Sequence, residues 1–433
     1  MAKEEMTTGQ QPIPRWRTNY TYILLFLLYM FDYIDRYVIV SLFPFLKSDW
    51  GLTDTELGLL VSAVFWSILV FTLPVGALID RWSRKKSIGI MSIFWSIATL
   101  AGAFTLNFKQ LFATRLAIGA GEAGYVPGGG AMISALFPPE KRARMFGIWQ
   151  AAIPLGSALG VALGGFIAAN FGWRHALGIV AIPGFIIAIM FFWVKDYKTV
   201  ELVKSMPAEN AVSKAKMGWR DIFAEFFRSK SLIMVNLAFA ACAFTTVALT
   251  SWLPSYFQRF EGMPIEKAGL MASVVMLLAV VGAPVGGFLT DQWFKKNTRA
   301  RMLLPAITTS LSAVLLFIGL FLLHGNALMG MLLAMGVTII MFAPGAVAVT
   351  QDVVHPGLRS SSLSICIVVQ HLLGSALGPL AIGSLSDQYG LDKALLCLPA
   401  FLLLAGILFF IGSFYYRKDV EKAEKVEVVF EGA

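Results

Sequence analysis

Residues 112–137, FATRLAIGAGEAGYVPGGGAMISALF, are apolar and long enough to cross a bilayer as a helix, yet they include Arg115 and Glu122. A charged side chain at the centre of a membrane helix costs about 2.5 kcal/mol or more, so such residues usually face a cavity lined by protein. The two residues are two helical turns apart, which places both side chains on one face. Glycines between and beyond them let other backbones approach and let the helix bend. We therefore predict a buried proton-and-anion site here.

The composition is that of an integral membrane protein. Of the 433 residues, 57% are hydrophobic and 14% are charged, and the mean hydropathy is +0.72. A soluble protein of this length would have about 25% charged residues. The net charge of +9 comes from basic residues scattered over separate loops, which excludes the continuous basic stripe of a nucleic-acid-binding protein.

Twelve apolar runs reach the length of about 20 residues that a helix needs to cross the hydrocarbon core. The expected spans are 20–44, 56–79, 87–106, 110–136, 145–169, 174–194, 232–257, 265–290, 302–323, 327–350, 358–385 and 391–416. Most Lys and Arg residues fall in the two tails and in the even-numbered loops, which predicts that both termini are cytoplasmic. We expect a multi-pass protein of the plasma (inner) membrane.

The chain divides into two similar halves. The expected segments are a tail at 1–19, a six-helix half at 20–194, a linker at 195–230, a second half at 231–416 and a tail at 417–433. The linker spaces Trp219, Ile222, Phe223, Phe226 and Phe227 as in an amphipathic helix on the membrane surface. The alternative is a solvated linker.

Repeats support this division. The sequence LGSALG at 155–160 recurs at 373–378, and GALID at 76–80 resembles GFLTD at 287–291. Two similar six-helix halves with a site between them at the bilayer midplane are typical of secondary transporters that work by alternating access.

Residues 76–85, GALIDRWSRK, resemble the signature loop of the major facilitator superfamily, except that Ser83 replaces the usual glycine. The resemblance covers the whole chain and implies the major facilitator fold. A carboxylate at a helix end can hold basic residues and a neighbouring helix end, and so latch one side shut. The predicted gating residues are Asp80, Arg81, Arg84, Lys85 and Asp291. For the basic residues, orientation of the chain in the membrane is the alternative role.

Three segments resemble the Spinster-like branch of that superfamily. They are 32–37 (DYIDRY), 119–125 (GAGEAGY), and 371–374 (HLLG) together with Ser386 and Asp387. The resemblance implies lysolipid-like substrates. Ser375 stands where the branch usually has aspartate, and the acidic and basic residues of the first and fourth spans also resemble proton-coupled symporters of organic anions.

Five ionisable residues should meet if the first and fourth spans are neighbours, as the resemblance implies: Asp32, Asp35, Arg36, Arg115 and Glu122. Three acids against two bases leave one surplus negative charge, so one carboxyl group should bind a proton. Glu122 is the first candidate and Asp35 the second. The alternative is that Asp32–Arg36 and Arg115–Glu122 are permanent ion pairs that join helices.

The guanidinium fork of arginine suits a carboxylate or phosphate head group. The predicted substrate contacts are Arg36, Arg115, Asp32, Tyr125, Gln150, Gln370 and Asn236. His371 could share the proton path, although a lone helical histidine is often only a packing residue. Because the second half has few deep polar groups, we expect a substrate with a polar head and a hydrophobic body.

No nucleophile–base pair, metal-ligand cluster or phosphate loop is present in the sequence, so we expect neither an enzyme nor a bound cofactor or metal. The three cysteines have no metal-ligand spacing. We expect a monomer that transports an amphipathic or lysolipid-like organic anion with protons. A proton-coupled symporter of small carboxylates is the nearest alternative, and a passive facilitator or a non-transporting receptor is a further one.

Overall fold

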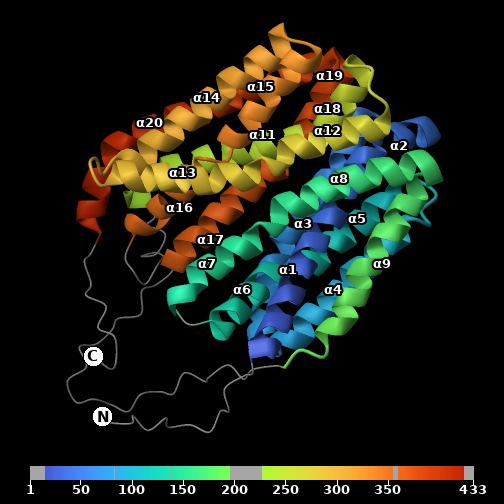
Figure 1. Cartoon of the computed structure of the whole chain (residues 1–433), viewed down its shortest axis with the longest axis horizontal. Helices are drawn as coiled ribbons and strands as arrows, with labels where there is room; N and C mark the ends of the chain where they lie inside the picture. The colour runs from blue at the N-terminus through green and yellow to red at the C-terminus, as the bar shows by residue number, and fades with distance from the viewer. Residues whose placement is uncertain (1–14, 82, 138, 196–226, 355–358, 424–433) are drawn as a thin grey trace.

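The computed structural model describes residues 15–81, 83–137, 139–195, 227–354 and 359–423, without the side chains of residues 73, 76–81, 139, 140, 142, 143 and 359–361. The described chain is helical throughout (Figure 1). The expected amphipathic helix at residues 219–227 lies almost entirely outside the described residues.

The first half contains the helices α1 (Arg15–Tyr37), η1 (Val38–Leu42), α2 (Phe43–Trp50), α3 (Asp54–Arg81), α4 (Arg84–Gly102), α5 (Phe108–Glu122), α6 (Tyr125–Leu136), α7 (Pro139–Gln150), α8 (Ala152–Phe171) and α9 (Trp173–Phe191). The second half contains α11 (Lys230–Phe260), α12 (Ile265–Leu277), α13 (Ala279–Phe294), α14 (Ala300–Leu322), α15 (Gly325–Thr338), α16 (Ala343–Asp352), α17 (Arg359–Gln370), the π-helix η3 (His371–Ser375), α18 (Gly378–Tyr389), α19 (Leu391–Leu395) and α20 (Leu398–Lys422).

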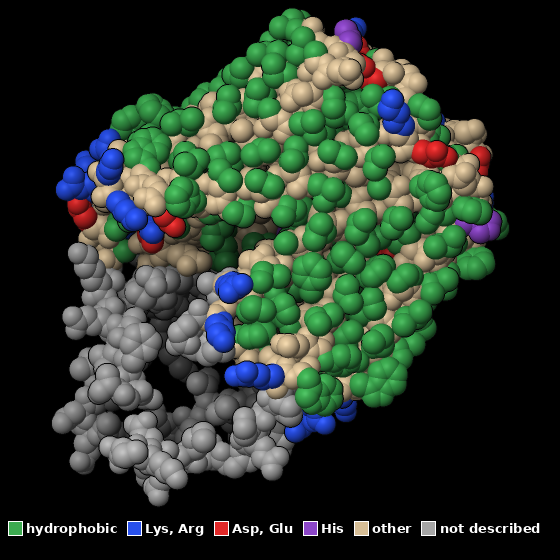
Figure 2. All heavy atoms as spheres, in the orientation of Figure 1, with side chains coloured by type: hydrophobic (Ala, Val, Ile, Leu, Met, Phe, Trp, Pro, Cys, Tyr) green, Lys and Arg blue, Asp and Glu red, His purple; other side chains and the backbone are tan. Residues whose placement is uncertain are grey.

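Among the described residues, nine helical segments are long and apolar enough to cross a membrane. The other three expected spans, 20–44, 87–106 and 110–136, coincide with α1 and η1, with α4, and with α5 and α6. Figure 2 shows hydrophobic side chains over the middle of the visible face and charged side chains toward its ends, as lipid contact requires. The predicted all-α membrane fold is confirmed.

The repeated sequence LGSALG makes the same contact in both halves. In α8, a Cβ atom added to Gly156 would lie 2.3 Å from the carbonyl oxygen of Met30 on α1. In the second half, a Cβ atom added to Gly374 would lie 2.5 Å from the carbonyl oxygen of Ala240 on α11. In each half, therefore, the glycine lets the fifth span pack directly on the backbone of the first span.

Ser83, which departs from the signature loop, has a local structural role. Its hydroxyl accepts a hydrogen bond of 3.1 Å from the backbone N–H of Lys86 and so caps the start of α4. A glycine at this position would lack that side-chain cap.

The two halves converge at the end of the molecule that carries α2 and α19 and diverge toward the opposite end (Figure 1). We call these the closed end and the open end. Near the closed end, α3 packs on α18 and α8 packs on α12. The hydroxyl of Ser273 on α12, for example, donates to the carbonyl oxygen of Ala158 on α8 at 2.7 Å. Toward the open end, Figure 2 shows the described surface hollowed between the halves.

Candidate functional site

A buried cluster of ion pairs joins α1 to α5 inside the first half. The Nη2 atom of Arg36 donates to both carboxylate oxygens of Asp32 at 3.2 Å and to Oε2 of Glu122 at 2.8 Å. Asp32 and Arg36 lie one helical turn apart on α1, so both side chains point to the same neighbour. The side chains of Arg36 and Glu122 are only 5% and 1% exposed. The structure thus brings together three residues that the sequence predicted to meet.

This cluster leaves polar atoms without partners. Nη2 of Arg36 serves three carboxylate oxygens, whereas the buried Nε atom has no hydrogen-bond partner among the described residues. In the same described set, Oε1 of Glu122 also lacks a partner. Buried polar atoms without partners are costly, so the cluster has a spare donor and a spare acceptor for a ligand or a proton.

Glu122 is placed by a break in its span. The sequence predicts one continuous helix over residues 110–136, but α5 ends at Glu122 and α6 begins at Tyr125. Close packing fixes the end of α5, because a Cβ atom on Gly119 would lie 2.4 Å from the carbonyl oxygen of Val64 on α3. The carboxyl group of Glu122 therefore lies at the end of α5, beside the two-residue turn that separates α5 from α6.

Arg115 has a different set of contacts from the one that the ion-pair alternative predicts. Its guanidinium group donates to three backbone carbonyls, those of Leu60 (3.1 Å), Asp35 (3.0 Å) and Arg36 (2.6 Å). Glu122 pairs with Arg36 instead. Arg115 thus fastens α5 to α1 and α3 through their backbones, and a role for it in substrate binding stays a prediction.

Asp35 is buried, and its position next to Arg36 in the sequence turns its side chain about 100° away from that of Arg36 around α1. A Cβ atom added to Gly184 on α9 would lie 3.9 Å from Oδ2 of Asp35 and 3.3 Å from the hydroxyl oxygen of Ser96 on α4. Neither carboxylate oxygen of Asp35 has a hydrogen-bond partner within the described part of the chain. Its carboxyl group faces α4 and α9, away from the ion pairs of Arg36.

Aromatic rings connect this cluster to the second half. The Cζ atom of Arg36 lies 4.5 Å from the ring centre of Tyr33 and 5.3 Å from that of Phe65. The centre of the Phe65 ring lies in turn 5.6 Å from the centre of the His371 ring. Phe65 therefore connects the arginine of the first half to the histidine of the second half. His371 lies in the π-helix η3, a distortion that often marks functional sites.

The other predicted contact residues lie in varied surroundings. Tyr125 is fully buried among aromatic rings, and its hydroxyl donates to the carbonyl oxygen of Leu25. Gln150, the last residue of α7, is exposed. On the second half, Nε2 of Gln370 lies 3.5 Å from Sγ of Cys366. Oδ1 of Asn236 and Nδ1 of His371 are buried and have no hydrogen-bond partner among the described residues, and contact of either residue with a substrate stays a prediction.

The predicted gate is only partly described. The side chains of Asp80 and Arg81 lie outside the described residues. Arg84 and Lys85 are half-buried at the start of α4, and Asp291 is exposed on α13. Gating by these five residues stays a prediction.

With this geometry in place, comparison with known proteins identifies the family. The model of the Major Facilitator Superfamily matches residues 25–379. The chain belongs to this superfamily. It is therefore a membrane transporter and not an enzyme.

Relatives within the superfamily include a transporter of sugar acids and a Spinster homolog. The hexuronate transporter of Bacillus subtilis (strain 168) is 28% identical over 396 residues, which cover 90% of this chain and 91% of the relative. Protein spinster homolog 1 of Xenopus laevis is 27% identical over 446 residues, which cover 93% of this chain and 82% of the relative.

A solved structure supports the fold. The crystal structure of a bacterial homolog of the human lysosomal transporter Spinster, in an inward-facing and unoccupied conformation, aligns with a TM-score of 0.80 at 21% identity. The alignment covers 95% of this chain and 99% of that structure. At this identity the likeness concerns the fold alone.

The sequence analysis did not predict a network of polar side chains at the open end of the second half of the transporter. Arg301 on α14 pairs with Asp352 on α16, and the hydroxyl of Tyr416 on α20 donates to the same carboxylate at 2.6 Å. The Cζ atom of Arg301 also lies 4.0 Å from the ring centre of Phe294. In the sequence, this network was indicated only by Asp352, an acidic residue at the end of an apolar span.

A second missed cluster lies at the closed end, where Asp54 begins α3. Its carboxylate accepts two hydrogen bonds from Arg259 of the other half, at 2.6 and 2.8 Å. The sequence analysis assigned no role to Asp54 or Arg259. Ser386 and Asp387, quoted above only as part of a resemblance, also belong to this cluster.

Proposed function

We propose that this protein is a proton-coupled secondary transporter of an organic anion, in which Arg36 binds the acidic head group and Glu122 carries the proton. The single observation that carries the proposal is a pair of buried atoms that have no partner among the residues the structure describes, Nε of Arg36 and Oε1 of Glu122. A carboxylate or phosphate group can accept a hydrogen bond from Nε, and a proton on Glu122 releases Arg36 from one of its two acidic partners.

The charge balance of the cluster supports proton coupling. Asp32, Asp35 and Glu122 could contribute three negative charges, against two positive charges from Arg36 and Arg115. All five side chains are buried, so the surplus negative charge is costly and one carboxyl group should bind a proton. When an anion arrives at Arg36, the number of bound protons has to rise to keep the balance.

The direction of opening follows from the proposed topology. With both termini in the cytoplasm, the closed end faces the outside of the plasma (inner) membrane and the open end faces the cytoplasm. The structure is then an inward-facing state of the alternating-access cycle. We propose that the protein acts as a monomer. A substrate would reach Arg36 from the hollow between the halves that Figure 2 displays.

We consider two classes of substrate, in order of preference. An amphipathic, lysolipid-like anion is our first choice, because deep polar groups are few in the second half and because relatives include proteins of the Spinster group. A sugar acid is the second, because Oδ1 of Asn236 and Nδ1 of His371 have no partner among the described residues and can bond to hydroxyl groups, and because relatives include a hexuronate transporter.

The test uses purified protein in liposomes with a pH-sensitive dye inside. Lysophospholipids and hexuronates are added in turn to the wild type, to Glu122→Gln and to the exposed control Glu421→Gln. We expect one substrate class to drive proton movement in the wild type and in the control. Glu122→Gln should lower this movement at least about tenfold, because an amide cannot carry the proton.

Substrate exchange across the same liposomes separates coupling from binding. Exchange needs no net proton transfer, so Glu122→Gln should retain it. Proton movement by Glu122→Gln at the wild-type rate would overturn the role of Glu122, and the absence of proton movement with every anion tested would overturn proton coupling itself.

A further inference from the structure

The carboxylate of Asp54 is bound by residues of both halves. Nζ of Lys47, in the same half, lies 2.9 Å from Oδ1. From the other half, Arg259 donates to Oδ2 at 2.6 Å and to Oδ1 at 2.8 Å, and the hydroxyl of Ser386 donates to Oδ2. Both oxygens of this buried carboxylate are therefore fully hydrogen-bonded.

The carboxylate of Asp387, on α18, makes the reciprocal contact. It accepts hydrogen bonds of 2.8 Å from the backbone N–H groups of Asp54 and Thr55 and one of 2.6 Å from the hydroxyl of Thr55. These N–H groups belong to the first residues of α3 and have no partner within their own helix. A negative charge at a helix start is also favoured by the helix dipole. A residue of the second half thus caps a helix of the first half.

Each half therefore contributes one carboxylate, Asp54 or Asp387, that accepts hydrogen bonds from the other half. We name the cluster of Asp54, Thr55, Arg259, Ser386 and Asp387 the carboxylate clasp. We propose that the carboxylate clasp is the gate of the closed end and that its strength sets how often this end opens during transport. The proposal rests on the proposed function, because only an alternating-access transporter has to open this end.

Backbone packing directly beneath the clasp makes the contact rigid. A Cβ atom on Gly383 of α18 would lie 2.3 Å from the carbonyl oxygen of Asp54, and one on Gly58 of α3 would lie 2.4 Å from the carbonyl oxygen of Pro379. The two helices touch backbone to backbone, so they have to separate as units. Separation then breaks every bond of the clasp together, which makes the gate cooperative.

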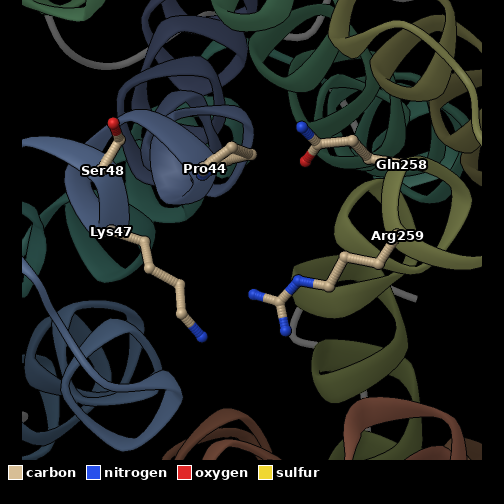
Figure 3. A pocket seen from close by; sticks show the side chains of 5 residues that line it. All are labelled: Pro44, Lys47, Ser48, Gln258 and Arg259. Atoms are coloured by element: carbon tan, nitrogen blue, oxygen red, sulfur yellow. The ribbon is translucent and has the colours of Figure 1, made fainter.

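A pocket at the closed end brings water to the clasp. It has a volume of about 370 Å³ and is lined by Pro44, Lys47, Ser48, Gln258 and Arg259. Figure 3 shows the side chains of Lys47 and Arg259 extending toward each other from opposite halves. Their side chains are 46% and 26% exposed, whereas that of Asp54 is 3% exposed. Water and salt can therefore reach the cations, so release of the clasp does not leave them as unpaired charges in a dry interior.

Lys47 and Arg259 make a matched pair for the test. Both bind Asp54, but only Arg259 crosses between the halves. Asp49 provides a second control, since it is a carboxylate of the same face that binds Trp173 (2.8 Å) and Arg174 (3.8 Å) within its own half.

The experiment measures the distance between spin labels on Lys109→Cys and Lys393→Cys, two exposed positions on opposite halves at the closed end. The native cysteines are replaced by alanine, and no substrate is added. We expect Arg259→Gln and Asp387→Ala each to raise the ratio of long to short distances about tenfold or more, because each removes bonds to a charged group. Asp49→Asn and Lys47→Gln should change this ratio less than about threefold.

The outcomes are distinct from those of the transport test. If neither clasp variant changes the ratio while both remain monodisperse with wild-type melting temperatures, the clasp is not the gate. An equal rise in Asp49→Asn would also overturn the proposal, since any lost carboxylate would then open this end. Arg259→Lys, which keeps the charge but not the fork, should give an intermediate ratio. Because no substrate is present, a failure of proton coupling leaves this result unaffected.

Discussion

The buried cluster around Arg36 and the carboxylate clasp contain the same types of charged residue, but they differ in how many of the polar atoms have hydrogen-bond partners. Around Arg36, one nitrogen atom serves three carboxylate oxygens, while Nε of Arg36 and Oε1 of Glu122 lack partners in the described part of the protein. In the clasp, both oxygens of Asp54 and both oxygens of Asp387 accept hydrogen bonds.

The two clusters also differ in what they join. Asp32, Arg36 and Glu122 belong to one half, so rocking of the halves need not break them. The clasp joins the halves and has to break whenever the closed end opens. The comparison indicates a division of labour, in which unsatisfied charges respond to a ligand or a proton and satisfied charges hold a conformation.

The largest effect that this comparison predicts is for Arg36→Ala. The change leaves Asp32 and Glu122 buried without a cationic partner, and breaking a buried pair in this way costs about 3–5 kcal/mol. We expect a large fall in the melting temperature of the purified protein and complete loss of substrate-driven proton movement.

Arg36→Lys is the control for that prediction. Lysine keeps the positive charge but lacks Nε and the planar fork, so stability should be largely retained while transport falls. A wild-type melting temperature for Arg36→Ala would contradict the view that this arginine neutralises the buried acids.

The sequence predicted the cluster around Arg36 better than it predicted the clasp, for a physical reason. Charges within apolar spans, such as Arg36 and Glu122, are costly enough to stand out from their surroundings. Their pairing was harder to foresee, because Arg115 was equally placed to meet Glu122 and its preference for backbone carbonyls depends on the packing of three helices.

The sequence contains no comparable indication of the clasp. Asp54 and Arg259 lie at span ends, where charged residues are common and usually only solvated. The bond from Thr55 to Asp387 joins residues that are 332 positions apart in the sequence. The repeat LGSALG, by contrast, predicted the paired halves correctly, since the glycines serve contacts that both halves share.

A smaller effect is expected when the closed end is wedged open without a change in charge. In Gly58→Ala the new methyl group would lie 2.4 Å from the carbonyl oxygen of Pro379 on the other half. Overpacking of this kind costs about 1–3 kcal/mol. If this cost falls only on the closed arrangement, the spin-label distances used for the clasp should shift about fivefold or more toward the long form.

Gly330→Ala is the matched control, because an added Cβ atom at that helical position would have no atom within 4 Å. It should leave the distances unchanged. A long-distance population that grows equally in both variants would show that the loss of a glycine, and not the wedge between α3 and α18, opens the closed end.

The smallest effect is expected for Glu421→Gln, which removes an ion pair that is short but exposed. Nε of Arg417 lies 3.0 Å from Oε1 of Glu421, closer than Nη2 of Arg36 lies to Asp32 at 3.2 Å. The side chains of Arg417 and Glu421 are 71% and 62% exposed, so water screens their attraction and exposed helical pairs contribute only about 0.3–0.5 kcal/mol. We expect an unchanged melting temperature, measured beside Arg36→Ala. Equal losses in the two variants would mean that the length of an ion pair, and not its burial, decides its contribution in this protein.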